Sequence, residues 1–147
     1  MSGSRKVLVV DDEDVVRLSH MRSLAGQNCN VEAAHGGDEA LEKMQRAPAD
    51  VVLLDLRMPG MDGLAALKAI KERWPETEVV IITGYPSVVT AREAVRLGAF
   101  DYLAKPVDPD KVLAVAHAAM AQRLASPRAG KGIPAQDPRK GWAKYVN

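Results

Sequence analysis

Five short apolar runs alternate along the chain with segments whose apolar residues recur at the spacing of a helix. The runs cover about residues 6–11, 30–34, 51–55, 78–83 and 100–103. This alternation predicts a parallel β-sheet with helices on both faces. The run at 51–55 is apolar up to its last residue, which predicts a strand at the centre of the sheet.

A helix is expected after each run, which gives five strand–helix units in the first 124 residues. The first helix should span about residues 13–25 and direct four apolar residues inward: Val16, Leu18, Met21 and Leu24. Pro48 should end the second helix. The last helix should begin near Pro109, with Asp108 as its N-cap.

The last part of the chain has a different composition. Residues 125–147 contain proline and glycine throughout and carry five basic residues against one aspartate. Because the whole chain has a formal net charge of +1, the preceding part is net acidic. We therefore expect one domain over residues 5–124 and a basic, largely unstructured C-terminal tail over residues 125–147. Within this tail, Trp142 and Tyr145 either fold back onto the domain, anchor a partner or remain free.

Several classes of protein are excluded by the composition. The chain is 47% hydrophobic and 27% charged, and no apolar run approaches the ~20 residues that a membrane span needs. The N-terminus lacks the apolar stretch of a secretory signal, and the single cysteine, Cys29, rules out an internal disulfide. These features predict a cytoplasmic protein. Nothing in the domain indicates a nucleic-acid surface, so nucleic acid is not an expected partner.

Four predicted strands end on residues that can hold a phosphoryl group or a metal ion. Asp11 and Asp12 follow the first run, Asp55 ends the third, Thr83 ends the fourth and Lys105 follows the fifth. In open parallel sheets ligands bind beyond the carboxyl ends of the strands, so these side chains should converge. Three carboxylates in one pocket repel each other unless a cation is bound. Hard oxygen ligands and a phosphate partner favour Mg²⁺.

Asp55 is the best candidate for a nucleophile, because the apolar strand before it should hold it rigidly. Attack of its carboxylate on a phosphoryl group would give an aspartyl phosphate. Lys105 would supply positive charge to the transferred oxygens, and Thr83 would offer a hydroxyl to the new phosphate.

Four segments together resemble a known family. They are Val-Val-Asp-Asp-Glu at the first strand, Leu-Asp-Leu-Arg-Met-Pro-Gly-Met-Asp-Gly around Asp55, Ile-Thr-Gly-Tyr before the fourth helix and Phe-Asp-Tyr-Leu-Ala-Lys-Pro at the fifth strand. In this order they resemble the receiver domain of bacterial two-component response regulators, over about residues 5–124. The resemblance implies a doubly wound α/β fold with five helices and five parallel strands in the flavodoxin-like order 2-1-3-4-5.

The resemblance also implies a phosphorylation site with its metal ion. A histidine kinase or a histidine phosphotransfer protein would phosphorylate Asp55. The metal would be Mg²⁺, bound by Asp12, Asp55, the main-chain carbonyl of Arg57 and, through water, Asp11.

Further positions have roles in this family that carry over to the present chain. Thr83 and Lys105 take the phosphate-contact positions, and the bond from Lys105 to the following proline is expected to be cis. Tyr102 takes the place of an aromatic switch that turns inward when the threonine moves to the phosphate; a buried core residue that does not switch is the alternative. Arg57 and Tyr85 occupy the two positions that tune the phosphate lifetime. The bulky Tyr85 should obstruct the attacking water and slow self-dephosphorylation.

The leading interpretation is a stand-alone signalling switch, not an enzyme, that catalyses only its own phosphorylation and dephosphorylation. Phosphate on Asp55 would change the surface of the fourth helix, fifth strand and fifth helix, and so reach a downstream protein. A homodimer that forms on phosphorylation is left open, as are the identities of the kinase and the target.

Two other functions are alternatives. The chain could be the receiver portion of a multidomain transcription regulator, although residues after Leu124 are too few for a helix-turn-helix or ATPase domain. The ending Tyr-Val-Asn, without an obvious tag, favours a complete chain. A phosphatase or phosphotransferase that uses an aspartyl phosphate usually has a second acid two positions beyond the nucleophile. Arg57 stands there and cannot serve.

Overall fold

Five parallel strands form a single sheet. The structure is a computed structural model that describes residues 5–58, 60–125 and 138–146. The strands are β1 (Arg5–Val10), β2 (Cys29–Ala34), β3 (Val51–Leu54), β4 (Glu78–Thr83) and β5 (Asp101–Ala104). Their order across the sheet is β2-β1-β3-β4-β5, as predicted, and the predicted strand bounds differ from the observed ones by at most a residue or so.

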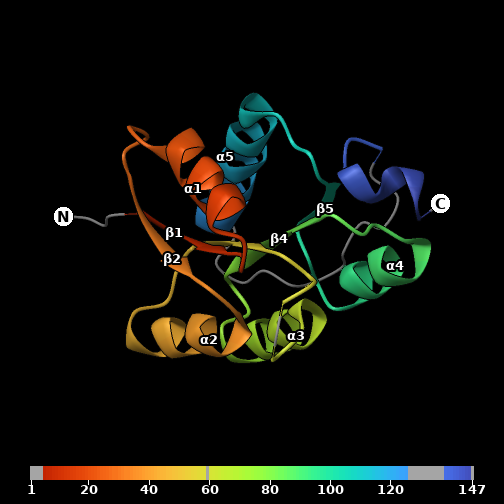
Figure 1. The fold of residues 1–147 in the computed structure, drawn as a ribbon, viewed down its shortest axis with the longest axis horizontal. Coiled ribbons are helices and arrows are strands. Elements are labelled where there is room, and N and C mark those ends of the chain that lie inside the picture. Colours follow the sequence, from red (N-terminus) through yellow and green to blue (C-terminus); the bar gives the residue numbers. More distant parts are fainter. Residues whose placement is uncertain (1–4, 59, 126–137, 147) are drawn as a thin grey trace.

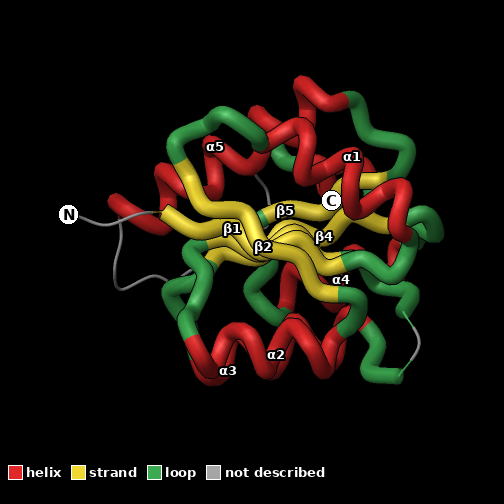
Figure 2. The backbone as a smooth tube through the Cα atoms, turned by 60° about the vertical axis from the view of Figure 1, so that its left-hand side comes forward, coloured by secondary structure: helices red, strands yellow, loops and turns green. Residues whose placement is uncertain are grey.

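Two layers of helices enclose the sheet (Figures 1 and 2). One face is covered by α1 and α5, and the other by α2, α3 and α4 (Figure 1). The helices are α1 (Asp14–Leu24), α2 (Gly37–Arg46), α3 (Gly63–Arg73), α4 (Val88–Arg96) and α5 (Pro109–Ala125). None of the helices in the described ranges is long and apolar enough to cross a bilayer.

The central position of β3 explains why its sequence is apolar throughout. All four of its residues are buried, and the side chains alternate between the two faces. Val52 and Leu54 pack into the apolar cluster under α2, α3 and α4. Val51 and Leu53 belong to the cluster under α1 and α5. A strand that is buried on both faces cannot show the alternation of apolar and polar residues that marks a half-exposed strand.

The inward face of α1 differs from the prediction. Leu24 is buried as expected, but Leu18 is 53% exposed, whereas Arg17 and His20 are buried. Arg17 can be buried because its guanidinium donates to the main-chain oxygen of Asp11 at 2.8 Å. The helix therefore directs a cation towards the acidic end of the sheet, and counting apolar residues alone misplaced Leu18.

The C-terminal residues of the described chain fold back onto the domain. Residues 141–144 form a short 3-10 helix, η1 (Gly141–Lys144), beside β5 (Figure 1). Trp142 is only 1% exposed and joins the apolar cluster under α2, α3 and α4. Of the three alternatives left open for Trp142 and Tyr145, the structure shows that they fold back onto the domain. The rest of the predicted tail up to residue 137 lies outside the described residues.

Candidate functional site

Two buried aspartates follow neighbouring strands at the carboxyl edge of the sheet. Val10 of β1 lies opposite Leu54 of β3, so Asp11 and Asp55 come next on paired strands. The main-chain N–H of Asp55 donates to the oxygen of Val10 at 3.0 Å, which extends the ladder by one step. Asp11 is 2% exposed and Asp55 is 5% exposed. Strand pairing, not loop conformation, therefore sets the separation of the two carboxylates.

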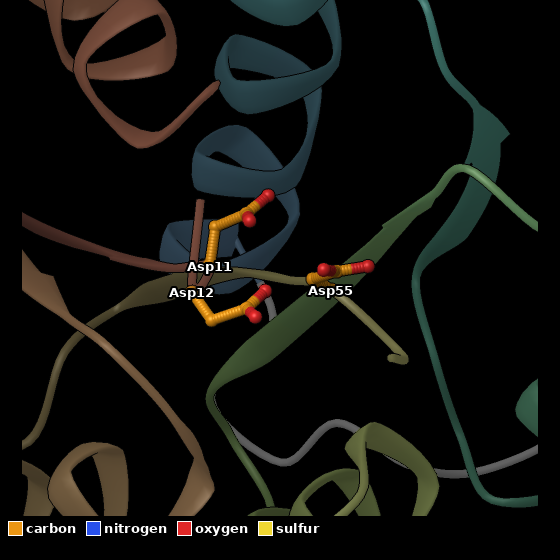
Figure 3. Close-up of side chains that lie close together, drawn as sticks. All are labelled: Asp11, Asp12 and Asp55. Carbon is orange, nitrogen blue, oxygen red and sulfur yellow. The ribbon is translucent and has the colours of Figure 1, made fainter. Parts of the chain in front are cut away.

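Asp12 and Lys105 complete a cluster of charges around this pair. Carboxylate oxygens of Asp11, Asp12 and Asp55 all lie within 4.8 Å of one another (Figure 3). The Nζ of Lys105 donates to Oδ2 of Asp11 at 2.9 Å and lies 3.6 Å from Oδ2 of Asp55. We call these four residues the acidic pocket. The structure thus brings together four of the side chains that the sequence placed at strand ends.

The position of Lys105 follows from the end of β5. Its main-chain N–H donates to the oxygen of Thr83 at 2.8 Å, and its bond to Pro106 is cis, as expected. Glu13, which was not predicted, also lies 3.5 Å from the ammonium. Burial lowers the pKa of Lys105, but the hydrogen bond and the charge of Asp11 outweigh it and raise that pKa above its usual value. Lys105 is therefore positively charged at neutral pH.

Asp55 is held in an environment that opposes its ionisation. Burial raises the pKa of its carboxyl, the negative charge of Asp11 raises it further, and Lys105 offsets only part of this, so that the pKa lies at about 6. The main-chain N–H of Arg57 also donates to Oδ1 of Asp55, at a long 3.4 Å. Near neutral pH the carboxylate is thus ionised but poorly compensated, which favours the approach of a cation.

The donor set of the acidic pocket fits a small hard divalent cation. The three carboxylates offer only oxygen atoms as ligands. A bound cation would lower the electrostatic energy of the pocket, because it would offset the repulsion between these carboxylates. Asp12 is exposed, so one side of the cluster is accessible from solvent. The three histidines belong to no such ligand cluster within the residues described. The predicted ligand role of the Arg57 carbonyl remains a prediction.

An open cleft of about 650 Å³ leads to the carboxylates. Tyr85 and Arg57 stand on its wall and stack on each other, with the guanidinium carbon 4.0 Å from the centre of the ring. Tyr85 is 62% exposed, so this cation–π pair is a surface feature at the mouth of the cleft. The two positions that the sequence linked to phosphate lifetime are therefore in direct contact.

The loop between β4 and α4 connects the cleft to Tyr102. Thr83 is fully buried, and its Oγ1 accepts a hydrogen bond from the main-chain N–H of Tyr85 at 3.0 Å. Further along the loop, the N–H of Ser87 donates to the hydroxyl of Tyr102 at 3.0 Å. That hydroxyl also lies 2.7 Å from Oγ1 of Thr90. Tyr102 is fully buried, with its ring turned inward, which fits both the aromatic switch and the core residue that does not switch.

Besides Glu13, sequence reasoning missed Arg17, which lies near the site. Arg17 binds the main-chain oxygen of Asp11 and also donates to Oδ1 of Asp14 at 2.5 Å. It therefore fixes the backbone that carries the first carboxylate. The three-residue spacing from Asp14 to Arg17 was the available signal, since such pairs face each other on a helix.

Gly63 brings the start of α3 against the end of β3. A Cβ atom at this position would collide with the main-chain oxygen of Asp55 and lie 2.5 Å from the Cα of Leu56. Asp62 caps the helix by accepting from the N–H of Ala65 at 2.9 Å. The start of α3 therefore packs directly against the backbone of Asp55 and helps to hold it in place.

The fold and the site together define the class of protein. Residues 7–117 match the model of the response regulator receiver domain. The chain belongs to this family, whose members are signalling domains of two-component systems.

Similar proteins include longer regulators. Regulatory protein AtoC of Escherichia coli is 43% identical over 112 residues, which make up 76% of this chain and 24% of AtoC. Transcriptional regulatory protein ZraR of the same species is 45% identical over 116 residues, or 78% of this chain and 26% of ZraR. The chain therefore spans about a quarter of the length of these relatives.

Solved structures show the same fold. The receiver domain of NtrX from Brucella abortus has a TM-score of 0.74 at 36% identity, with 78% of this chain and 98% of that chain covered. A CheY-like receiver domain protein from Methanospirillum hungatei has a TM-score of 0.80 at 25% identity and covers 84% of this chain and 98% of its own.

Proposed function

We propose that this protein is a phosphorylation-dependent switch that accepts a phosphoryl group on Asp55. The proposal depends on one observation above all: Asp55 shares a pocket with two further carboxylates and with the ammonium of Lys105, 3.6 Å away. We assign the switch to residues 5–124 and treat residues 125–147 as a C-terminal extension.

The donor would be the phosphohistidine of a cytoplasmic histidine kinase or phosphotransfer protein. An Oδ atom of Asp55 attacks the phosphorus, the P–O bond forms as the P–N bond breaks, and the leaving imidazole takes a proton from solvent. Lys105 offsets the charge that accumulates on the transferred oxygens. The Oγ1 of Thr83 accepts from Tyr85, which leaves its own hydrogen to donate to the phosphate.

A divalent cation completes the proposed site, and Mg²⁺ suits its oxygen donors best. Asp12 and Asp55 would bind it directly, together with the carbonyl of Arg57, and Asp11 would bind through water. When bound, the ion would neutralise the carboxylates and the incoming phosphate. The raised pKa of Asp55 supports this assignment, because the pocket has more negative charge than Lys105 alone compensates.

Phosphorylation can reach the surface through the loop after Thr83. Tyr102 binds this loop at Ser87 and the first turn of α4 at Thr90, so a shift of Thr83 towards a phosphate would alter how Tyr102 is held. The responsive surface would be formed by α4, β5 and α5, and a downstream protein would bind there.

The direct test is phosphorylation in vitro. The full chain is incubated with acetyl phosphate and MgCl₂, and intact mass spectrometry measures the addition of one phosphoryl group. We expect stoichiometric labelling that requires the metal and disappears in Asp55→Asn. Asp62→Asn is the matched control, because Asp62 lines the same cleft but caps α3. Labelling that persists in Asp55→Asn, or repeated turnover of the phosphodonor without a stable adduct, would contradict the proposal.

The second candidate is that these residues are the receiver part of a longer transcription regulator. It is supported by the length of AtoC and ZraR, of which the match covers about a quarter. Reading the gene beyond the codon for Asn147 distinguishes this candidate from a stand-alone switch.

A further inference from the structure

Residues 138–146, here called the C-terminal segment, bind to β5 through specific polar contacts. The main-chain N–H of Gly141 donates to Oδ1 of Asp101 at 2.6 Å. The Nζ of Lys140 donates to the main-chain oxygen of Phe100 at 2.7 Å and lies 3.3 Å from the centre of that ring. The Asp101 carboxylate that accepts this bond is only 4% exposed.

The segment also fits its site sterically. A Cβ atom at position 141 would collide with the main-chain oxygen of Tyr102 and lie 2.6 Å from Cδ2 of Leu103, so the backbone approaches β5 as closely as only glycine allows. One residue further on, Trp142 is buried in the same cluster as Ala91 of α4 and Tyr102. This is a shaped contact, distinct from an accidental collapse of an apolar side chain.

Tyr102 connects the segment to the loop beside the phosphorylation site. Its ring packs edge to face against Tyr145, with 5.4 Å between ring centres and an angle of 72° between planes. Its hydroxyl binds Ser87 and Thr90 on the other side. Tyr102 thus has the C-terminal segment at one end and the loop that begins at Thr83 at the other. Tyr145 therefore packs against the same ring that would have to move if Tyr102 turned outward.

The contact is suited to reversible docking. The Nε1 of Trp142 is buried and finds no hydrogen-bond partner among the residues described, and such burial opposes docking. The segment is also joined to α5 through twelve further residues, 126–137, and loses conformational entropy when it docks. Both costs bring the docked and undocked states closer in free energy.

We propose that the C-terminal segment is an intramolecular ligand of the α4–β5 face, and that its docking holds Tyr102 inward. A partner protein that uses this face must displace the segment. The family resemblance implies that Tyr102 turns inward when Thr83 moves to the phosphate, so this inference rests on the proposed function for one consequence: docking and phosphorylation should favour each other. The coupling is reciprocal, so loss of docking should weaken phosphorylation.

Docking can be measured without phosphorylation. The chain contains two tryptophans, so Trp74→Phe leaves Trp142 as the only one. In this background we expect blue-shifted emission and weak acrylamide quenching for Trp142. Gly141→Val should red-shift the emission and increase quenching several-fold, with unchanged far-UV circular dichroism. Tyr145→Ala should act in the same direction but less strongly. Lys68→Ala, which removes an exposed side chain of α3 away from the segment, is the control.

Quenching of Trp142 that matches the urea-unfolded chain before any substitution would overturn the docking. A dimer in sedimentation experiments that dissociates in Gly141→Val would assign the segment to a second copy and overturn the intramolecular form.

Coupling is tested in the same background with acetyl phosphate and MgCl₂. We expect phosphorylation to reduce the quenching of Trp142, and Tyr145→Ala to lower the phosphorylated fraction at steady state. A phosphoryl group found on Asp55 by mass, with no change at Trp142, would overturn the coupling and leave the proposed function intact. Absence of the phosphoryl group would refute the proposed function and the coupling with it. The docking would still be decided by comparing the acrylamide quenching of Trp142 with and without the Gly141→Val substitution.

Discussion

The acidic pocket and the aromatic contact of Tyr102 with the C-terminal segment are linked by one loop but differ in their energetics. In the pocket, like charges are held together, and burial and repulsion raise the pKa of Asp55 to about 6. At Tyr102, apolar surface is buried and most polar groups are paired. The pocket therefore costs stability, and the contact adds to it. The acidic pocket would gain stability from a bound cation, because the cation relieves the repulsion between its carboxylates. The C-terminal segment needs no ligand to bind, and it can dissociate without unfolding the domain.

The largest expected effect concerns Lys105, the positively charged side chain of the acidic pocket. Lys105→Met removes the charge next to Asp55, so phosphorylation by acetyl phosphate should slow by about 10²–10³-fold, the usual effect of losing one electrostatic group at a reacting centre. The labelling rate by mass spectrometry measures it. Lys68→Met, an exposed change on α3, should leave the rate unaltered. A slowing of less than about tenfold would show that Lys105 serves only to pair Asp11.

Next in size is the effect of Asp55 on stability. In the folded protein its pKa rises from 3.8 to about 6, so between these values the native state holds more protons than the unfolded chain. The free energy of unfolding should therefore fall as pH rises through this window, with the full penalty, at most about 3 kcal/mol, above pH 6. Asp55→Asn should be more stable than wild type at pH 7 in the presence of EDTA and nearly equal to it at pH 4. Urea unfolding at both pH values checks this, and equal stabilities at pH 7 would contradict it.

Substitutions at two glycines, one beside the acidic pocket and one in the C-terminal segment, should differ in their effect on the free energy of unfolding. Gly63→Ala forces a Cβ atom into the backbone of Asp55 and should destabilise the domain by about 1–3 kcal/mol, because neither α3 nor β3 can move away. Gly141→Ala meets β5 just as closely, but the segment can dissociate, so global stability should fall by no more than about 1 kcal/mol. Thermal unfolding of both variants measures the difference. Equal losses would mean that the segment is part of the domain core.

The smallest effect is expected at the mouth of the cleft. Tyr85→Ala removes the ring that stacks on Arg57 and opens a path for water, so the half-life of the phosphate should shorten. Loss of an exposed cation–π contact amounts to about 0.5–1 kcal/mol, which corresponds to roughly two- to fivefold in rate. Phosphate release after removal of acetyl phosphate measures the half-life. An unchanged half-life would show that the ring does not obstruct the attacking water.

Much of the fold could be predicted because its signals are local. The apolar run at Val51–Leu54 and the residues that follow it report a central strand with a functional end. The apolar residues of α5 that recur at helical spacing are buried, because this periodicity identifies the inward face of a helix: Val112, Val115, Ala116, Ala119 and Met120.

The errors arose where a polar residue competes for an inward position. On α1, burial of Arg17 depends on an acceptor, the main-chain oxygen of Asp11, whose position is set by a different strand. Exposed Leu18 could not be identified without knowing that contact. The burial of Asp101 similarly depends on Gly141, forty residues away in the chain.

The sequence by itself determined the sheet, its helices and the set of groups that meet at its carboxyl edge, because strand ends and their neighbours are fixed by short-range pattern and by parallel pairing. Only the tertiary structure decided that Arg57 stacks on Tyr85, that Tyr102 faces inward and that Trp142 is buried beside β5. These are contacts between surfaces brought together from distant parts of the chain, and their free energy depends on shape and on available hydrogen-bond partners, which no local pattern records.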